Sequence, residues 1–273
     1  MAFLEGTWLQ VHQFNHLPTD RNSLAELITL ARQFRAGGLL VKAFDGDAWM
    51  GSEISHPDTA PDGLRAFEQI ADQRARCSSA GLGYGVWTNP LHPDDFPHLG
   101  SEFIDRQADL YAKAGNAAGL LVFDSEDGAG FWGGNRPVGD ARRLMERFRA
   151  QAPNCVTVWQ PDGRRQFSHL QRLRPEEWGP NMNVYSPQVY WTDFQRPCKT
   201  VVQEHFATFR DLKASGQLWE GAEWRPTFPG DAEPGDLLDS MALAASQGAT
   251  GCIIFQLATL RPENFPIIRE AAG

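Results

Sequence analysis

One unit repeats eight times along this chain, and no other feature of the sequence constrains the fold as strongly. Each unit is a short apolar run, then a polar loop rich in Gly, Pro and Asp, then a longer stretch with the spacing of an amphipathic helix. Strands that alternate with helices favour a parallel sheet, because parallel strands need long crossover connections. The apolar runs cover residues 7–14, 37–44, 82–88, 119–126, 155–160, 183–191, 218–224 and 251–257.

The helical stretches between these runs complete the pattern of a closed barrel. Eight strand–helix units in 273 residues match a (β/α)8 TIM barrel, which typically needs about 250 residues. No linker or low-complexity segment interrupts the repeat, so we predict an α/β fold in which residues 1–273 form a single TIM-barrel domain. The predicted helices cover residues 23–36, 62–80, 101–115, 139–152, 164–173, 199–216, 234–248 and 262–272.

An open, doubly wound sheet is the alternative architecture for alternating strands and helices. Such sheets usually have about five or six strands, and those that bind dinucleotides carry a Gly-rich turn after the first strand. Residues 15–23, which follow the first apolar run, contain no glycine. The sequence therefore favours the barrel.

Charge and composition exclude several kinds of partner. The chain has 25 Lys and Arg against 34 Asp and Glu, and this net charge of −9 opposes binding to the phosphates of a nucleic acid. No apolar run reaches the ~18 residues of a membrane-spanning helix, and the first residues do not form a signal peptide. We therefore expect a chain that is cytoplasmic when synthesised and binds neither nucleic acid nor membrane. The widely spaced cysteines are expected to be buried free thiols; they are Cys77, Cys155, Cys198 and Cys252.

Two carboxylates, Asp124 and Glu126, end the fourth apolar run in the sequence LLVFDSED. Side chains alternate across a strand, so both carboxyls point the same way, and the carboxyl ends of barrel strands form the face where chemistry occurs. Repulsion and burial can keep one carboxyl of such a pair protonated while the other stays charged, as glycosidic bond hydrolysis requires. We therefore expect the pKa of Glu126 to exceed its ordinary value of ~4.3. The alternative is that both carboxyls only pair with basic loop residues or cap the next segment.

Tryptophans and polar residues recur at the ends of the predicted strands. Aromatic rings suit the apolar faces of sugars, so the sequence predicts that the tryptophans line a substrate groove, with packing in the core as the alternative. Amide, hydroxyl and carboxyl groups can bind sugar hydroxyls, and Tyr190 and Glu223 are the stronger candidates among them. The tryptophans are Trp49, Trp87, Trp132, Trp159, Trp191 and Trp224, and the polar candidates are Gln13, Asp45, Asp47, Asn89, Gln188, Tyr190, Glu223 and Gln256.

Motifs for other chemistries are absent from the sequence. It contains no Gly-x-Ser-x-Gly elbow, no His-Glu-x-x-His helix and no P-loop. Asp45-Gly46-Asp47 is similar to the start of a calcium-binding loop, but the glutamate that completes an EF-hand is missing. We therefore expect neither a metal nor a cofactor.

Two strand ends resemble glycoside hydrolase family 25, the lysozyme-type muramidases. They are FDSED, which contains Asp124 and Glu126, and IIFQL, which closes in the pair Phe255-Gln256. The resemblance implies a TIM barrel that cleaves a β-linked amino-sugar polymer such as peptidoglycan. It also implies that Glu126 is the proton donor and that Asp124 is its electrostatic or substrate-assisting partner.

The first predicted strand departs from that family, because it ends in His12 and Gln13 where the family has an Asp. We expect Gln13 to face the barrel mouth and to bind a substrate hydroxyl or acetamido group. The departure keeps a second function open, a non-catalytic carbohydrate-binding or structural barrel that assembles into a phage or secretion particle and leaves the cell with it or by lysis. An isomerase or aldolase of sugar phosphates is disfavoured, because no Gly-rich turn follows the last two strands.

Overall fold

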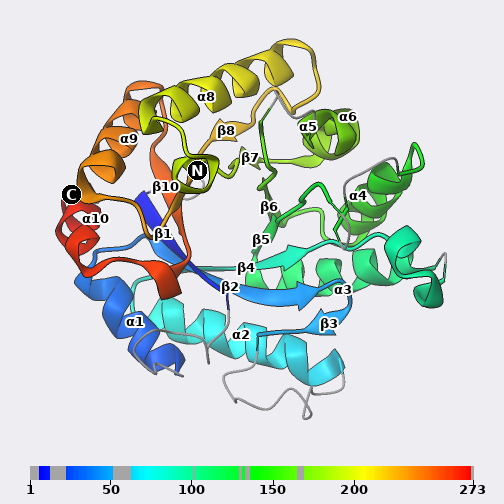
Figure 1. Cartoon of the computed structure of the whole chain (residues 1–273). Coiled ribbons are helices and arrows are strands. Elements are labelled where there is room, and N and C mark those ends of the chain that lie inside the picture. The colour runs from blue at the N-terminus through cyan, green and yellow to red at the C-terminus, as the bar shows by residue number, and fades with distance from the viewer. Residues whose placement is uncertain are drawn as a thin grey trace.

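The structure, a computed structural model, describes residues 6–12, 23–51, 63–100, 102–128, 131–132, 136–164 and 169–271. Its strands form one curved sheet, and helices surround this sheet on the outside (Figure 1). The strands are β1 (Gly6–Val11), β2 (Gly38–Asp45), β3 (Ala48–Trp49), β4 (Gly83–Asn89), β5 (Leu120–Phe123), β6 (Val156–Trp159), β7 (Val184–Tyr185), β8 (Glu223–Trp224), β9 (Thr227–Pro229) and β10 (Gly251–Phe255).

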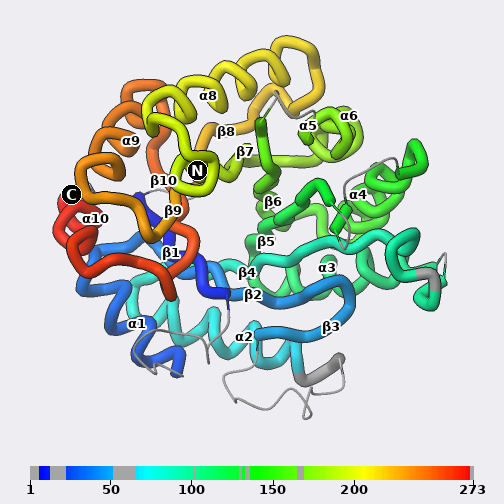
Figure 2. Tube along the Cα trace, viewed as in Figure 1, coloured from blue at the N-terminus to red at the C-terminus, as the bar shows by residue number. Residues whose placement is uncertain are grey.

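The sheet closes on itself through a strand position that is split into β8 and β9. Its order is β8-β7-β6-β5-β4-β2-β1-β10-β9, and β3 forms an antiparallel hairpin with β2. β8 pairs with β7, β9 pairs with β10, and two residues separate β8 from β9. Figure 2 shows the first and last strands, β1 and β10, side by side. A closed parallel sheet with helices outside it is a (β/α)8 barrel, so the predicted fold is confirmed.

The helices largely follow the predicted positions. α1 begins at a capping box in which the Ser23 and Glu26 side chains bond to each other's backbone N–H. One prediction needs correction, because Trp191 begins α7 instead of ending a strand. Of the predicted helix 164–173, residues 165–168 lie outside the described residues, and α5 covers residues 169–172. The helices are α1 (Leu24–Gln33), α2 (Gly63–Ser79), α3 (Phe103–Ala118), α4 (Asp140–Gln151), α5 (His169–Arg172), α6 (Pro175–Trp178), α7 (Trp191–Phe194), α8 (Cys198–Ala214), α9 (Pro234–Ser246) and α10 (Phe265–Ala271).

The seventh strand lies only in part where the apolar run 218–224 predicts it. β8 begins at Glu223, and β9 extends the same strand position to Pro229. The strand tolerates the charged Arg225 because its guanidinium donates to the Glu223 carboxylate at 2.5 Å. Pro226 has no N–H to donate, but its carbonyl accepts a backbone hydrogen bond from β10 at 3.0 Å. The loop expected after this run therefore contains β9.

The barrel interior is apolar at the end where the strands begin. Trp8 fills this end, and its ring lies against Gly38 and Gly83, the first residues of β2 and β4. A Cβ atom at Gly38 would come within 2.6 Å of the ring, and one at Gly83 within 2.4 Å, so both positions need glycine. The other residues of this inner core are Leu40, Trp87, Leu120, Val122, Val158, Val184 and Ile253.

A layer of buried polar side chains separates this apolar end from the barrel mouth. The Gln10 and Gln160 amides donate to each other at 3.1 and 2.9 Å, and Gln160 also donates to Thr227 Oγ1 at 2.8 Å. The Ser186 hydroxyl lies 2.8 Å from the same threonine oxygen. These groups satisfy one another without water, and they support the side chains at the mouth.

The four cysteines are buried and none of them forms a disulfide, as the sequence predicts. Burial raises the pKa of the Cys252 thiol to about 12, so this thiol stays protonated and unreactive. Among the described helices, none is long and apolar enough to cross a membrane.

Candidate active site

The two carboxyls at the end of the fourth strand converge on one amide. Asp124 follows β5 directly, and its N–H donates to the Thr88 carbonyl of β4 at 2.9 Å. The Gln188 amide donates to Asp124 Oδ1 at 2.7 Å and to Glu126 Oε1 at 3.0 Å. Gln188 lies in the segment after β7, where it forms an isolated parallel bridge with Thr227 of β9. The predicted carboxyl pair therefore faces a single site at the barrel mouth.

Both carboxyls of this pair have raised pKa values. Asp124 is 4% exposed, and burial raises its pKa, with further repulsion from Glu126. Burial also raises the pKa of Glu126, and the Asp162 carboxylate adds repulsion. Gln188 opposes both changes, because its N–H bonds stabilise the charged carboxylates. The predicted direction for Glu126 is confirmed, and a carboxyl that keeps its proton is suited to general acid catalysis.

A buried cation lies close to the pair. Lys42 of β2 is 3% exposed, and its Nζ lies 2.7 Å from Asp45 Oδ1. The same ammonium lies 3.4 Å from His12 Nε2 and 4.7 Å from the centroid of the Trp87 ring. Its positive charge lowers the pKa of both carboxyls of the pair.

A second charged cluster flanks Glu126 on the side of β6. Arg164 donates to the Asp162 carboxylate through bonds of 2.6 to 3.1 Å. His169 Nδ1 lies 3.1 Å from Asp162 and 3.7 Å from Asp127. The negative charge of Asp162 is therefore held in place beside the general-acid candidate.

Tyr190 and Phe255 form the aromatic side of the mouth. Their rings stack with centroids 5.7 Å apart, and Phe255 packs edge-on against Trp87 at 6.1 Å. Burial, with the nearby charges of Asp124 and Glu126, holds the pKa of the Tyr190 phenol well above its usual range, so its O–H remains a donor. Phe255 is only partly buried, so its ring can contact a sugar. Its place in the IIFQL motif was the only signal for it in the sequence.

The predicted row of tryptophans along a groove is wrong for most of its members. Trp224 packs against two phenylalanines of α8, and Trp132 packs against Trp178 at 5.3 Å. Trp87 does lie inside the barrel, where its Nε1 donates to the Val11 carbonyl at 2.8 Å. Side chains alternate along a strand, so a position at a strand end does not by itself bring a ring into the mouth. Five rings are at most 3% exposed, Trp87, Trp132, Trp159, Trp191 and Trp224, and Trp49 is partly buried against Phe44.

Two predicted carboxylates lie away from the pair. Glu223 begins β8 in register with Val184 of β7, below the mouth. Its predicted position at a strand end is wrong, because the strand continues to Pro229, and its carboxylate pairs with Arg225. Asp47 is exposed in the turn that joins β2 to β3.

The other predicted polar residues lie at strand ends near the mouth. Asp45 and Asn89 are the last residues of β2 and β4 and stand in register with each other. Gln256 follows β10 and is partly buried. Substrate binding by these residues stays a prediction. Gln13, with the expectation about its direction, lies outside the described residues.

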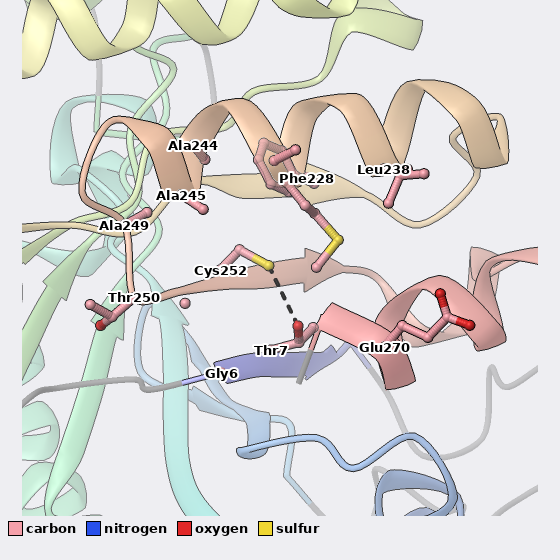
Figure 3. A pocket seen from close by; sticks show the side chains of 13 residues that line it. Gly6, Thr7, Phe228, Leu238, Ala244, Ala245, Ala249, Thr250, Cys252 and Glu270 are labelled. Atoms are coloured by element: carbon pink, nitrogen blue, oxygen red, sulfur yellow. Dashed lines mark hydrogen bonds between the residues drawn. The ribbon is translucent and has the colours of Figure 1, made fainter. Parts of the chain in front are cut away.

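A separate apolar cavity of about 390 Å³ lies outside the barrel, between the sheet and its outer helices. Figure 3 shows it between α9, α10 and the strands β1 and β10. Its lining includes Gly6 and Gly251, the first residues of these two strands, together with Leu238 and Cys252. The carboxyl pair lies where the strands end, so this cavity does not belong to the candidate site.

No protein-family model and no curated protein matches this chain. Solved structures do resemble it. An endo-β-1,4-mannanase from Thermotoga petrophila has a TM-score of 0.68 at 10% identity, over 98% of this chain and 76% of that one. A chitinase from Rhizomucor miehei has a TM-score of 0.64 at 11% identity, over 98% and 100%. The spore cortex-lytic enzyme SleL from Bacillus cereus has a TM-score of 0.62 at 9% identity, over 98% and 74%. At such identities the similarity shows the fold alone, a TIM barrel.

Proposed function

We propose that the chain is a single-domain glycoside hydrolase, similar to family 25, that cleaves a β-linked amino-sugar polymer such as peptidoglycan. The observation that carries the proposal is the convergence of Asp124 and Glu126 on the Gln188 amide at the barrel mouth. Two carboxyls with raised pKa values can protonate a glycosidic oxygen and stabilise the positive charge that develops on the sugar. The similarity in fold to a chitinase and a spore cortex-lytic enzyme supports this substrate class.

The surroundings of the two carboxyls assign them different roles. Glu126 is the more exposed of the two, and we assign it the role of general acid that protonates the leaving oxygen. Asp124 is buried below it and acts as the partner that stabilises the sugar cation or orients an acetamido group. Tyr190 supplies a neutral O–H donor, and the Phe255 ring supplies a surface for the apolar face of the sugar.

The geometry of the pair predicts hydrolysis with retention of the anomeric configuration. Asp124 Oδ1 and Glu126 Oε1 lie 2.7 and 3.0 Å from the same nitrogen, so they are at most about 5.7 Å apart. Retaining enzymes separate their carboxyls by about 5–5.5 Å, whereas inverting enzymes need about 6.5–9.5 Å to admit a water. Proton NMR of fresh digests of chitin and peptidoglycan oligosaccharides should show the β-anomer first. Initial release of the α-anomer would contradict the assigned roles.

A non-catalytic carbohydrate-binding or structural barrel of a phage or secretion particle is the second candidate function. It is favoured by the end of the first strand, where His12 follows β1 and no carboxylate occupies the place of the family's Asp. A carbohydrate-binding barrel should bind these polymers without releasing product. A structural barrel should neither bind nor cleave them.

A further inference from the structure

We propose that Lys42 is a positioning residue, whose ammonium keeps one carboxylate ionised in the Asp124–Glu126 pair while the other carboxyl holds a proton. The catalytic consequence of this role rests on the proposed function. The proton equilibrium of the pair can nevertheless be measured without any substrate.

An irregularity in β2 builds the environment of Lys42. The register between β2 and β4 shifts between Lys42 and Phe44, as in a β-bulge, so two residues of β2 stand opposite one of β4. In an unbroken strand Lys42 and Asp45 would face opposite sides of the sheet. The extra residue places them on the same side, where their charged atoms lie 2.7 Å apart. Phe44 packs instead against Tyr111 of α3, on the helix side of the sheet.

The burial of the Lys42 ammonium is costly unless negative charges nearby stabilise it. Removing an ammonium from water costs several kcal/mol, which close pairing must offset. Lys42 is 3% exposed, and among the described residues its shortest polar contact is the ion pair to the partly exposed Asp45. Its Nζ also lies 3.4 Å from His12 Nε2 and 4.7 Å from the centroid of the Trp87 ring. The ammonium is therefore buried inside the barrel, where little water screens its charge from the other charges of the mouth.

Lys42 stands in register with Trp87 of β4, and Trp87 with Val122 of β5, two positions before Asp124 on the same face. Its ammonium, 4.7 Å from the centroid of the Trp87 ring, therefore lies on the inner face of the sheet that also carries the pair. Its charge lowers the pKa of Asp124 and of Glu126, against the burial that raises both. Asp45 and Asp162 act in the opposite direction, Asp45 on Asp124 and Asp162 on Glu126. The titratable and charged groups around the pair and its neighbours are His12 after β1, Lys42 and Asp45 of β2, Asp127 after β5, Asp162 and Arg164 after β6, His169 of α5, Tyr190 after β7 and, next to Tyr190, Asp193 of α7.

The sign of the effect follows from these charges. Without the ammonium, burial and mutual repulsion keep both carboxyls protonated to a higher pH. A doubly protonated pair retains its acid but loses the carboxylate that stabilises the sugar cation. Lys42 therefore moves the pH range in which the pair holds one proton and one negative charge to lower pH.

The test is an NMR titration of the side-chain carboxyl carbons in the full chain. Asp124→Asn and Glu126→Gln assign the two signals, and the pair is treated as one coupled system with two macroscopic steps. In Lys42→Met we expect both steps to move to higher pH, the lower one by about 1 unit, a tenfold rise in proton affinity. Lys42→Arg keeps the charge and should leave both steps close to those of the wild type. Lys199→Met removes an exposed lysine that pairs with Asp239 and should change neither step.

An unchanged titration in Lys42→Met would overturn the inference, and so would an equal change in Lys42→Arg. Thermal melts of each variant establish that the titrated protein is folded. If the wild type proves inactive on every polymer, the proposed function fails while the titration still decides the role of Lys42. If it is active, the acidic limb of kcat/KM in Lys42→Met should move to higher pH together with the titration.

Discussion

Glu126→Gln is expected to lower kcat on chitin or peptidoglycan oligosaccharides by about 10³-fold, the contribution typical of a general acid. The amide keeps the size of the side chain and can still meet the Gln188 amide, which lies 3.0 Å from Glu126 Oε1. It has no acidic proton to transfer to the leaving oxygen. Affinity for the oligosaccharide should change little, because the aromatic and amide groups of the mouth remain. Steady-state kinetics and calorimetric titration measure the two quantities separately.

Glu223→Gln is the matched control for that experiment. The substitution is the same, but Glu223 lies below the mouth and pairs with Arg225, for which Gln still offers an oxygen acceptor. Its kcat should stay within about twofold of wild type, since it touches none of the reacting atoms. A Glu126→Gln variant that retains full turnover would remove the assigned proton donor. Loss of turnover in Glu223→Gln alone would move the chemistry to another site.

Trp8→Ala is expected to lower the free energy of unfolding by about 3–5 kcal/mol, the range for large aromatic truncations in a packed core. The Trp8 ring fills the amino end of the barrel against two glycines that have no side chain to occupy the space. Removing the ring leaves a cavity that Gly38 and Gly83 cannot fill. Equilibrium urea denaturation measures the change.

Trp219→Ala removes the same side chain from the surface, because Trp219 is 43% exposed. Its cost should stay below about 1 kcal/mol, as for most surface substitutions. If both variants lose similar stability, Trp8 does not anchor the barrel interior.

The repeat of apolar runs was sufficient to predict the barrel, because local patterns of buried residues identify six of its strands. Only β8, the first part of the seventh strand, lies in the predicted run, and its continuation in β9 was missed for a long-range reason. Residues 223–229 contain Arg225 and Pro226, which argue against a strand in isolation. Glu223 neutralises the arginine, and the proline lies where pairing passes from β7 to β10, so neither residue is unfavourable in the closed sheet.

The carboxyl pair was predictable from its position, whereas the side chains that complete the site were not. Two residues that end a strand two positions apart must face the same side, so Asp124 and Glu126 could be placed from the sequence. Gln188 joins them only because the chain after β7 returns to this place, over 60 positions along the sequence. The alternation that placed the carboxyls also places Trp159 and Trp224, in register with Phe123 and Tyr185, toward the helices. A position at a strand end does not show on which face of the sheet a ring lies, so the tryptophan groove was predicted wrongly.

A crystal structure of Glu126→Gln with a bound chitin or peptidoglycan oligosaccharide tests the central claim most directly. We predict a glycosidic oxygen within about 3 Å of the side chain at position 126, the distance that proton transfer requires. The adjoining sugar ring should lie against Phe255, with Asp124 beneath its anomeric carbon. An oligosaccharide bound elsewhere on the barrel, with no sugar in reach of Asp124 or Gln188, would contradict the assignment of this site to glycoside hydrolysis.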